Sequence, residues 1–170
     1  IADKVDVILP SIYTFYPDYN KDGSPRPLEY DRWVRYATTN IVEARQFGKP
    51  VLAYIWPYYH GGGGSTDPSA PDYRYWKSQP IGSEFWRLVL DTTEAYADGT
   101  IIYGSSEVNW SETLPWWTTT QAFMDEVGAA RATAEQTTVG SVVAGSYRDT
   151  RSDDVASVYL TVTSVNDLPV

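Results

Sequence analysis

Three apolar runs in this chain each end in aromatic residues, and this repeated pattern constrains the fold more than any other feature. The runs cover residues 5–16, 51–60 and 100–106. Helix-like segments that close with glycine precede the second and third runs, so the order of elements predicts parallel strands joined by crossover helices. In such sheets, ligands bind beyond the C-terminal ends of the strands. Aromatic faces with a polar tip suit sugar rings, so the leading hypothesis is a carbohydrate site.

Helical periodicity predicts three helices, over residues 30–46, 83–97 and 119–130. Each has apolar residues that mark a buried face: Trp33, Ala37, Ile41 and Ala44 in the first, Phe85, Leu88, Val89 and Tyr96 in the second, and Phe123, Met124 and Val127 in the third. Gly48 suits a left-handed cap after the first helix. Ser83 is predicted to cap the second.

The rest of the chain divides by composition. Residues 61–80 are rich in glycine and proline and predict a long irregular loop on the ligand side. After residues 131–138, which form a linker, residues 139–170 alternate like half-buried strands. We therefore expect an α/β fold in which residues 1–130 form part of a (β/α) TIM-type barrel, followed by a short all-β, sandwich-like tail. The first residues enter a strand directly, so we expect a piece of a longer polypeptide.

Charge and composition exclude several partners. The 170 residues carry a net charge of −9, with a pI near 4.5. Nucleic acid and acidic membranes would be repelled. No apolar run approaches the roughly 20 residues that a membrane span needs. Cysteine is absent, which excludes disulfides and Cys-ligated metals. We expect no required cofactor.

Tyrosines near the ends of the three strands are the first candidates for substrate binding. Tyr13, Tyr54 and Tyr103 occupy comparable positions. A tyrosine there can stack on a sugar ring and donate its hydroxyl, although packing under the loops is the alternative. Trp56 follows Tyr54 on the same strand. Because side chains alternate along a strand, only some of the aromatic residues that follow can face a ligand.

His60 and Trp110 complete the predicted substrate-binding set. His60 is the only histidine, so it cannot belong to a multi-histidine metal site. It is a candidate base or hydrogen-bond donor, with an ordinary surface histidine as the alternative. Trp110, like Trp116 and Trp117, could form a stacking wall or pack against the third helix.

Acidic residues supply no convincing catalytic pair. Glu107 and Glu112 follow the third strand, but neither lies on a strand, where a catalytic acid is held most rigidly. A glycosidase needs two carboxyls, or one carboxyl and a substrate acetamido group. We therefore assign no catalytic residue and interpret both glutamates as solvated loop groups.

A calcium-loop pattern occurs after the first strand. Asp18, Asn20, Asp22 and Glu29 match the spacing of such loops. A strand rather than a helix leads into this segment, and prolines remove backbone donors within it. The alternatives are a calcium-ordered loop of another type and a polar turn. In the tail, three acidic residues could also bind calcium or form turns: Asp149, Asp153 and Asp154.

Three segments, at residues 9–13, 50–54 and 99–104, together resemble the C-terminal half of hyaluronidase-family glycoside hydrolases. The resemblance covers roughly residues 5–124 and implies a distorted (β/α) barrel. It also implies that Tyr13 and Tyr103 correspond to aromatic substrate-site positions. The family's catalytic Asp-x-Glu pair would lie upstream of Ile1. The family has an arginine after the second-strand tyrosine where Trp56 stands here, so a neutral or N-acetylated glycan is the expected substrate.

The last residues, 160–170, resemble the closing strand and linker of cadherin-like repeats in bacterial surface proteins. This implies an extracellular or cell-surface protein with neighbouring domains in the same polypeptide. The sequence thus predicts part of a glycoside hydrolase that is inactive by itself. The alternative is a non-catalytic glycan-binding or adhesion module.

Overall fold

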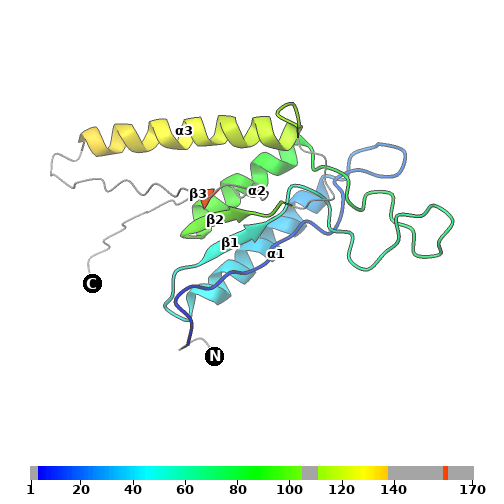
Figure 1. Cartoon of the computed structure of the whole chain (residues 1–170), viewed down its shortest axis with the longest axis horizontal. Helices are drawn as coiled ribbons and strands as arrows, with labels where there is room; N and C mark the ends of the chain where they lie inside the picture. Colours follow the sequence, from blue (N-terminus) through cyan, green and yellow to red (C-terminus); the bar gives the residue numbers. More distant parts are fainter. Residues whose placement is uncertain (1–3, 105–110, 138–158, 161–170) are drawn as a thin grey trace, which may run out of the picture.

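The computed structural model describes residues 4–104, 111–137 and 159–160. Its helices are α1 (Leu28–Arg45), α2 (Ser83–Tyr96) and α3 (Pro115–Thr137), and its strands are β1 (Leu52–Ile55), β2 (Gly99–Ile102) and β3 (Tyr159–Leu160). Figure 1 shows the helices side by side, with α2 between α1 and α3. The predicted alternation of strands and helices is confirmed.

The first aromatic run pairs with β1 in the parallel direction, although it is too irregular to form a named strand. Bridges join Ile8 to Val51 and Ser11 to Tyr54. The Tyr54 N–H donates to the Pro10 carbonyl at 2.9 Å. Pro10 has no N–H to donate in return, so one bond of the ladder is missing. The proline therefore explains why the predicted first strand is broken.

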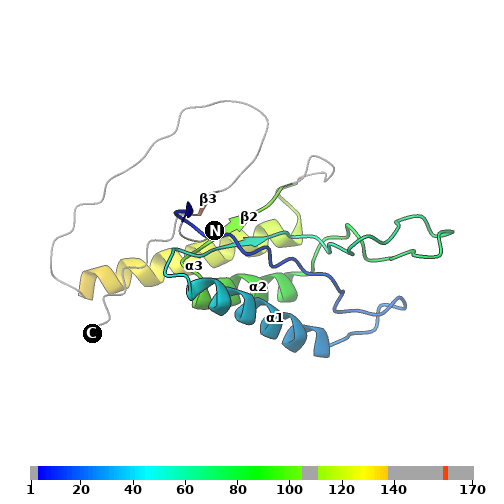
Figure 2. The same ribbon diagram turned by 90° about the horizontal axis from the view of Figure 1, so that it is seen from below.

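The next pair of strands is regular. β1 and β2 are parallel, with Tyr54 opposite Ile101 and Ile55 opposite Ile102. The three aromatic runs thus lie side by side in the order first run, β1, β2, and all point the same way, as the sequence predicts. Figure 2 shows α1 and α2 on one side of these strands.

The hydrophobic core lies between the strands and the helices. The predicted inner face of α1 is confirmed, since its four apolar residues are all buried. In α2, Phe85 and Val89 are buried, but Tyr96 is 45% exposed, so its predicted place in the apolar stripe is wrong. Tyr96 is the last residue of α2, and this end of the helix extends beyond the core. Trp86, fully buried, donates its indole N–H to Thr120 at 2.8 Å and ties α2 to α3.

Helix ends differ in detail from the predictions. α1 begins two residues earlier, after Pro27, and ends before Gly48, whose positive φ of 63° confirms the left-handed turn. Ser83 is the first residue of α2 rather than its cap. The N-cap is Gly82, and no side chain caps this helix, so the prediction for Ser83 is wrong. α3 is longer at both ends than the predicted 119–130.

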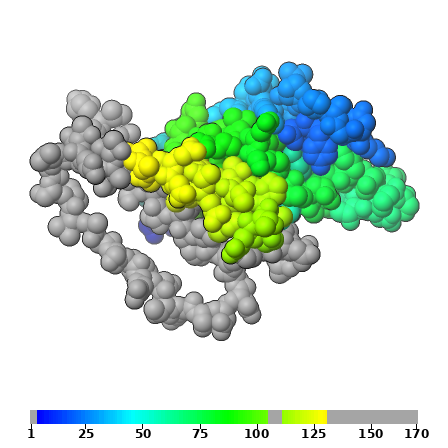
Figure 3. Space-filling view, turned by 90° about the horizontal axis from the view of Figure 1, so that it is seen from above, coloured from blue at the N-terminus to red at the C-terminus, as the bar shows by residue number. Residues whose placement is uncertain are grey.

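Two long loops extend from the C-terminal ends of the strands. They cover residues 17–27 and 61–82, and Figures 2 and 3 show them adjoining at one end of the molecule. The predicted irregular loop at 61–80 is confirmed. Both loops stand at the end of the strands where the aromatic runs finish.

Within the tail, the structure describes only β3. It pairs antiparallel with β2, with Tyr159 opposite Ile101. The remaining tail residues, including Asp149, Asp153 and Asp154, lie outside the described ranges, so a separate sandwich-like module stays a prediction. Among the helices that the structure describes, none has the length and hydropathy of a bilayer-spanning segment.

Candidate functional site

Five of the predicted binding residues form one continuous aromatic cluster. This aromatic cluster consists of Tyr13, Tyr54, Trp56, His60 and Tyr103. Tyr13 lies 6.0 Å from Tyr54 and 6.1 Å from Trp56, measured between ring centroids. Tyr103 lies 5.8 Å and 6.1 Å from the same two rings. Tyr13 and Tyr103 therefore converge on shared neighbours on one face of the sheet.

Strand alternation explains why these rings gather. On β1, Ala53 and Ile55 are buried, whereas Tyr54 and the following Trp56 are partly exposed. Ile102 on β2 is also buried, and Tyr103 after it is 39% exposed. Because successive side chains point to opposite faces, the small and aliphatic residues face the helices and the rings face away from them.

His60 lies at one edge of the cluster. Its ring stacks on Tyr13 at 5.2 Å with an interplanar angle of 18°. Phe15 and Trp56 contact it edge-on, at 5.0 Å and 5.9 Å. The backbone holds it too, since the His60 N–H donates to the Thr14 carbonyl at 2.8 Å. The imidazole is therefore fixed among three aromatic rings.

The protonation of the cluster follows from its partial burial. Burial is the main cause that raises the pKa of Tyr13 to about 12, and the phenols of Tyr54 and Tyr103 raise it further. Burial also lowers the pKa of His60, and the positive charge of Lys77 lowers it further. Near neutral pH the phenol of Tyr13 and the imidazole of His60 are therefore both neutral.

The long 61–82 loop is tied to the strand ends by side chains. The Trp76 indole N–H donates to the Phe15 carbonyl at 3.0 Å, and the Tyr75 hydroxyl donates to the Tyr19 carbonyl at 2.9 Å. Arg74 donates to the Gly61 carbonyl at 2.6 Å, and Lys77 donates to the Gly64 carbonyl. The first two bonds hold the loop beside the end of the first aromatic run, and the other two close the loop on itself.

The proposed calcium loop uses its acidic groups within the protein. Asp18 accepts hydrogen bonds from the Tyr30 hydroxyl at 2.9 Å and from the Tyr59 hydroxyl. Burial, and after it the hydrogen bonds to Asp18, raise the pKa of both tyrosines, that of Tyr30 to about 12. Asp22 accepts from the Ser24 N–H and hydroxyl. The loop is thereby closed by contacts among its own side chains and nearby tyrosines.

Glu29 belongs to a different group of charges. It is buried and pairs with Arg26 at 2.6 Å and with Arg32 at 3.0 Å. Asn20 donates to the Ser24 hydroxyl instead. In the ranges that the structure describes, no three His, Cys, Asp or Glu side chains are grouped so that they could hold a metal ion. Calcium binding by this loop stays a prediction.

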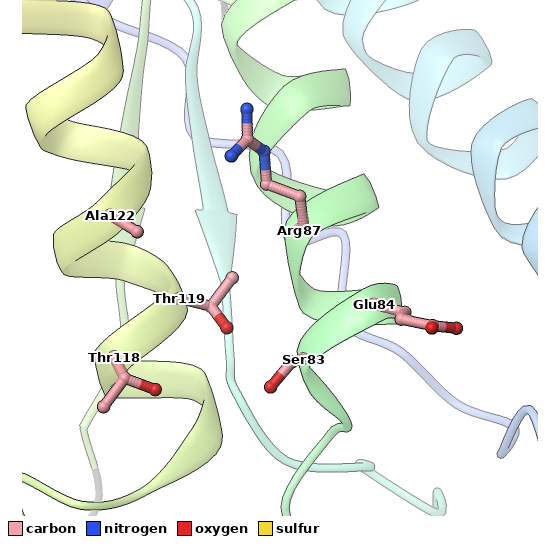
Figure 4. Close-up of a pocket in the computed structure, with 6 residues that line it drawn as sticks. All are labelled: Ser83, Glu84, Arg87, Thr118, Thr119 and Ala122. Carbon is pink, nitrogen blue, oxygen red and sulfur yellow. The ribbon is translucent and has the colours of Figure 1, made fainter.

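The structure also has two cavities, and Tyr13 of the aromatic cluster lines the first of them. A cavity of about 320 Å³ is bounded by residues 13–16, the first half of α1 and Phe85. A second, of about 560 Å³, lies between α2 and α3. Figure 4 shows Ser83 and Thr119 on its facing walls, while Glu84 points away from α3. Arg87, which lines it, is bonded to Asp91 and Glu126.

The other predicted residues have varied outcomes. Trp110 and Glu107 lie outside the described residues. Glu112 is exposed, as expected of a loop group. Trp116 is buried against Trp86, with ring centroids 6.4 Å apart, so it packs in the core rather than forming a stacking wall.

Sequence reasoning missed two residues beside His60. Phe15 could have been found, because it lies two residues after Tyr13 and strand alternation puts both on the same face. Lys77 follows His60 by 17 positions within an irregular loop. No local pattern predicts its effect on the imidazole.

Comparison with known proteins gives a similarity of fold. No family model and no curated protein matches this chain. A crystal structure of bee venom hyaluronidase aligns with 76% of this chain and 36% of its own length, at 21% identity and a TM-score of 0.44. Bee venom hyaluronidase in complex with a hyaluronic acid tetramer aligns with 72% of this chain and 32% of its own, at 20% identity and a TM-score of 0.40.

The chain therefore spans about a third of the length of these hyaluronidase structures. Its parallel strands and helices resemble part of the hyaluronidase barrel, and the similarity concerns the fold alone. The resemblance of the tail to cadherin-like repeats finds no support in these comparisons.

Proposed function

We propose that this chain is the sugar-binding part of a hyaluronidase-like glycoside hydrolase barrel that acts on a neutral or N-acetylated glycan. The observation that carries the proposal is the aromatic cluster itself. Rings from the first aromatic run, from β1 and from the residue after β2 meet at the strand ends, where ligands of such folds bind.

The cluster has the chemistry that a sugar requires. A pyranose ring has apolar C–H faces and a rim of hydroxyl groups, and an aromatic side chain with a polar tip can serve both. Tyr13, Tyr54 and Tyr103 supply phenol hydroxyls beside their ring faces. Tyr103 is 39% exposed, so its ring is accessible to a ligand.

The charge of the protein favours an uncharged ligand. Its net charge of −9 opposes a polyanion at long range. The cluster itself contributes phenols, an indole and one imidazole whose pKa is lowered, and the nearby Lys77 ammonium donates to the Gly64 carbonyl. A neutral or N-acetylated glycan is therefore a better fit than a polyuronic one.

Catalysis requires a carboxyl acid as well as a bound sugar. The two described acids nearest the cluster in sequence are already engaged, since Asp18 accepts from two tyrosines and Asp98 pairs with Arg45. We propose that the acid comes from another part of the parent polypeptide. The alternative is a non-catalytic glycan-binding module. The contacts of the aromatic cluster fit this alternative equally well if the parent polypeptide has no catalytic acid.

Calorimetric titration of the 170-residue chain tests sugar binding. We expect chitotetraose, a neutral N-acetylated tetrasaccharide, to bind more tightly than a hyaluronan tetrasaccharide. Tyr103→Ala should weaken binding of chitotetraose by about tenfold, which corresponds to roughly 1.4 kcal/mol.

Tyr96→Ala is the matched control, because Tyr96 is 45% exposed at the end of α2, outside the aromatic cluster. It should leave the affinity unchanged. Equal affinities of Tyr103→Ala and the unmodified protein, or no sugar binding at all, would refute the proposal.

A further inference from the structure

The hydrogen bonds of His60 define which of its ring nitrogens carries the proton. The backbone N–H of Gly62 donates to Nδ1 of His60 at 3.2 Å. A backbone N–H can only donate, so Nδ1 must accept. In the neutral imidazole the proton therefore lies on Nε2, which is left as a hydrogen-bond donor.

No described residue accepts a hydrogen bond from Nε2. The ring is only partly buried, so the group is not sealed within the core. Its surroundings are apolar: Tyr13 stacks on one face, and Phe15 and Trp56 contact the ring edge-on. The nearby charge of Lys77 and partial burial both lower the pKa of His60 and so favour the neutral ring.

We propose that His60 is a specificity-determining residue that donates its Nε2–H to the acetamido carbonyl of an N-acetylated sugar. This inference rests on the proposed sugar-binding function and adds to it a residue and a substituent. The hyaluronidase resemblance is carried by residues 9–13, 50–54 and 99–104, which do not include His60.

One N–H donor surrounded by apolar rings favours an acetamido group over a hydroxyl group as the ligand of His60. A carbonyl oxygen only accepts, so a single N–H donor satisfies it. The methyl group of the acetamide is apolar and can pack against the rings of Tyr13 and Phe15. A hydroxyl in the same place would accept from Nε2 but would turn its own O–H toward aromatic rings, without a good acceptor.

Loop geometry keeps the donor in place. Gly61, between His60 and Gly62, has a positive φ of 62°, which turns the Gly62 N–H back toward the imidazole. Arg74 donates to the Gly61 carbonyl at 2.6 Å and holds this turn from the other side. The tautomer is therefore set by the backbone of the glycine-rich loop rather than by a titrating partner.

Chitotetraose and cellotetraose form the decisive pair of probes, since both are neutral and differ at the acetamido-bearing carbon. The unmodified protein should bind chitotetraose at least about tenfold more tightly than cellotetraose. His60→Leu should abolish this preference by weakening chitotetraose alone. His60→Gln, whose side-chain amide keeps an N–H in a similar place, should restore part of it.

The outcomes separate the two proposals. If the unmodified protein binds neither sugar, the proposed function fails and this inference fails with it. If it binds both equally, or if His60→Leu weakens both to the same degree, sugar binding stands and the role of His60 is overturned.

Nitrogen NMR of the unmodified protein gives a second test that needs no variant. The chain has one histidine, so its ring signals need no further assignment. We expect the Nε2–H tautomer at neutral pH and a shift of the Nε2 signal on addition of chitotetraose. The Nδ1–H tautomer, or an Nε2 signal that chitotetraose leaves in place, would overturn the inference.

Discussion

Tyr13 and His60 stack with their ring centroids 5.2 Å apart, although Tyr13 belongs to the first aromatic run and His60 follows β1. Tyr13 also contacts Tyr54 and Trp56, so it joins the imidazole to the rest of the aromatic cluster. The pair therefore combines a flat stacking surface with a hydrogen-bond donor.

Tyr13→Ala should weaken chitotetraose binding by about tenfold or more, because it removes a ring face and also frees His60 from its stack. Tyr13→Phe keeps the ring and loses only the hydroxyl, so its affinity should stay within about threefold of the unmodified protein. Titration calorimetry checks both variants, and thermal denaturation shows that they are folded. Equal losses in the two variants would mean that the hydroxyl, rather than the ring face, makes the contact.

Stability should fall in mild acid through His60. Its pKa is lowered in the folded state, so below the ordinary value of 6.5 the unfolded chain takes up a proton that the folded protein binds less well. This stability is present above pH 6.5 and is lost as the pH falls toward the lowered pKa. The groups that face His60 are the rings of Tyr13, Phe15 and Trp56 and the charge of Lys77.

Urea denaturation from neutral to acid pH checks this effect against His60→Gln, which has no titrating ring. The acid-dependent loss should be smaller in the variant. Parallel curves for the two proteins would contradict the claim, because the loss would then come from the carboxylates alone.

Gly61→Ala should destabilise the loop that carries His60. The positive φ of 62° disfavours alanine by about 1–2 kcal/mol. An added Cβ would also lie 2.7 Å from Cβ of Lys77. Gly63→Ala is a matched control in the same loop, since nothing lies within 4 Å of its added Cβ. Gly61→Ala should lower the melting temperature and weaken the affinity for chitotetraose. Gly63→Ala should leave both quantities unchanged.

Asp18→Ala should cost about 2 kcal/mol of folding stability, because it leaves the hydroxyls of Tyr30 and Tyr59 without their shared acceptor. Asp22→Ala should have little effect, since Asp22 is exposed and bonds only with the neighbouring Ser24. Urea denaturation measures both. The same curves with added calcium test the calcium hypothesis, since a bound ion would raise the stability of the folded state.

Local patterns predicted much of the fold because they reflect local physics. The spacing of Trp33, Ala37, Ile41 and Ala44 marked the buried face of α1, and alternation along β1 predicted that only some of the aromatic residues could share one side. The convergence of Tyr13 and Tyr103 followed from parallel pairing. These features need no knowledge of distant contacts.

Contacts between distant residues could not be predicted in the same way. The calcium-like spacing around Asp18 gave no sign that Tyr59, 41 positions away, would bond to its carboxylate. The effect of Lys77 on His60 likewise depends on the path of the 61–82 loop. Pro10 was visible in the sequence, but its consequence for the first strand depends on which of its neighbours pair with β1.

The indole N–H signal of Trp56 gives the most direct test of the central claim that the aromatic cluster binds sugar. Trp56 lies within the cluster, whereas Trp33 and Trp86 lie in the core. Trp56→Phe identifies the signal in the NMR spectrum of the chain. On titration with chitotetraose, the Trp56 signal should shift while those of Trp33 and Trp86 stay in place. A Trp56 signal that does not move when the sugar is bound would contradict the account.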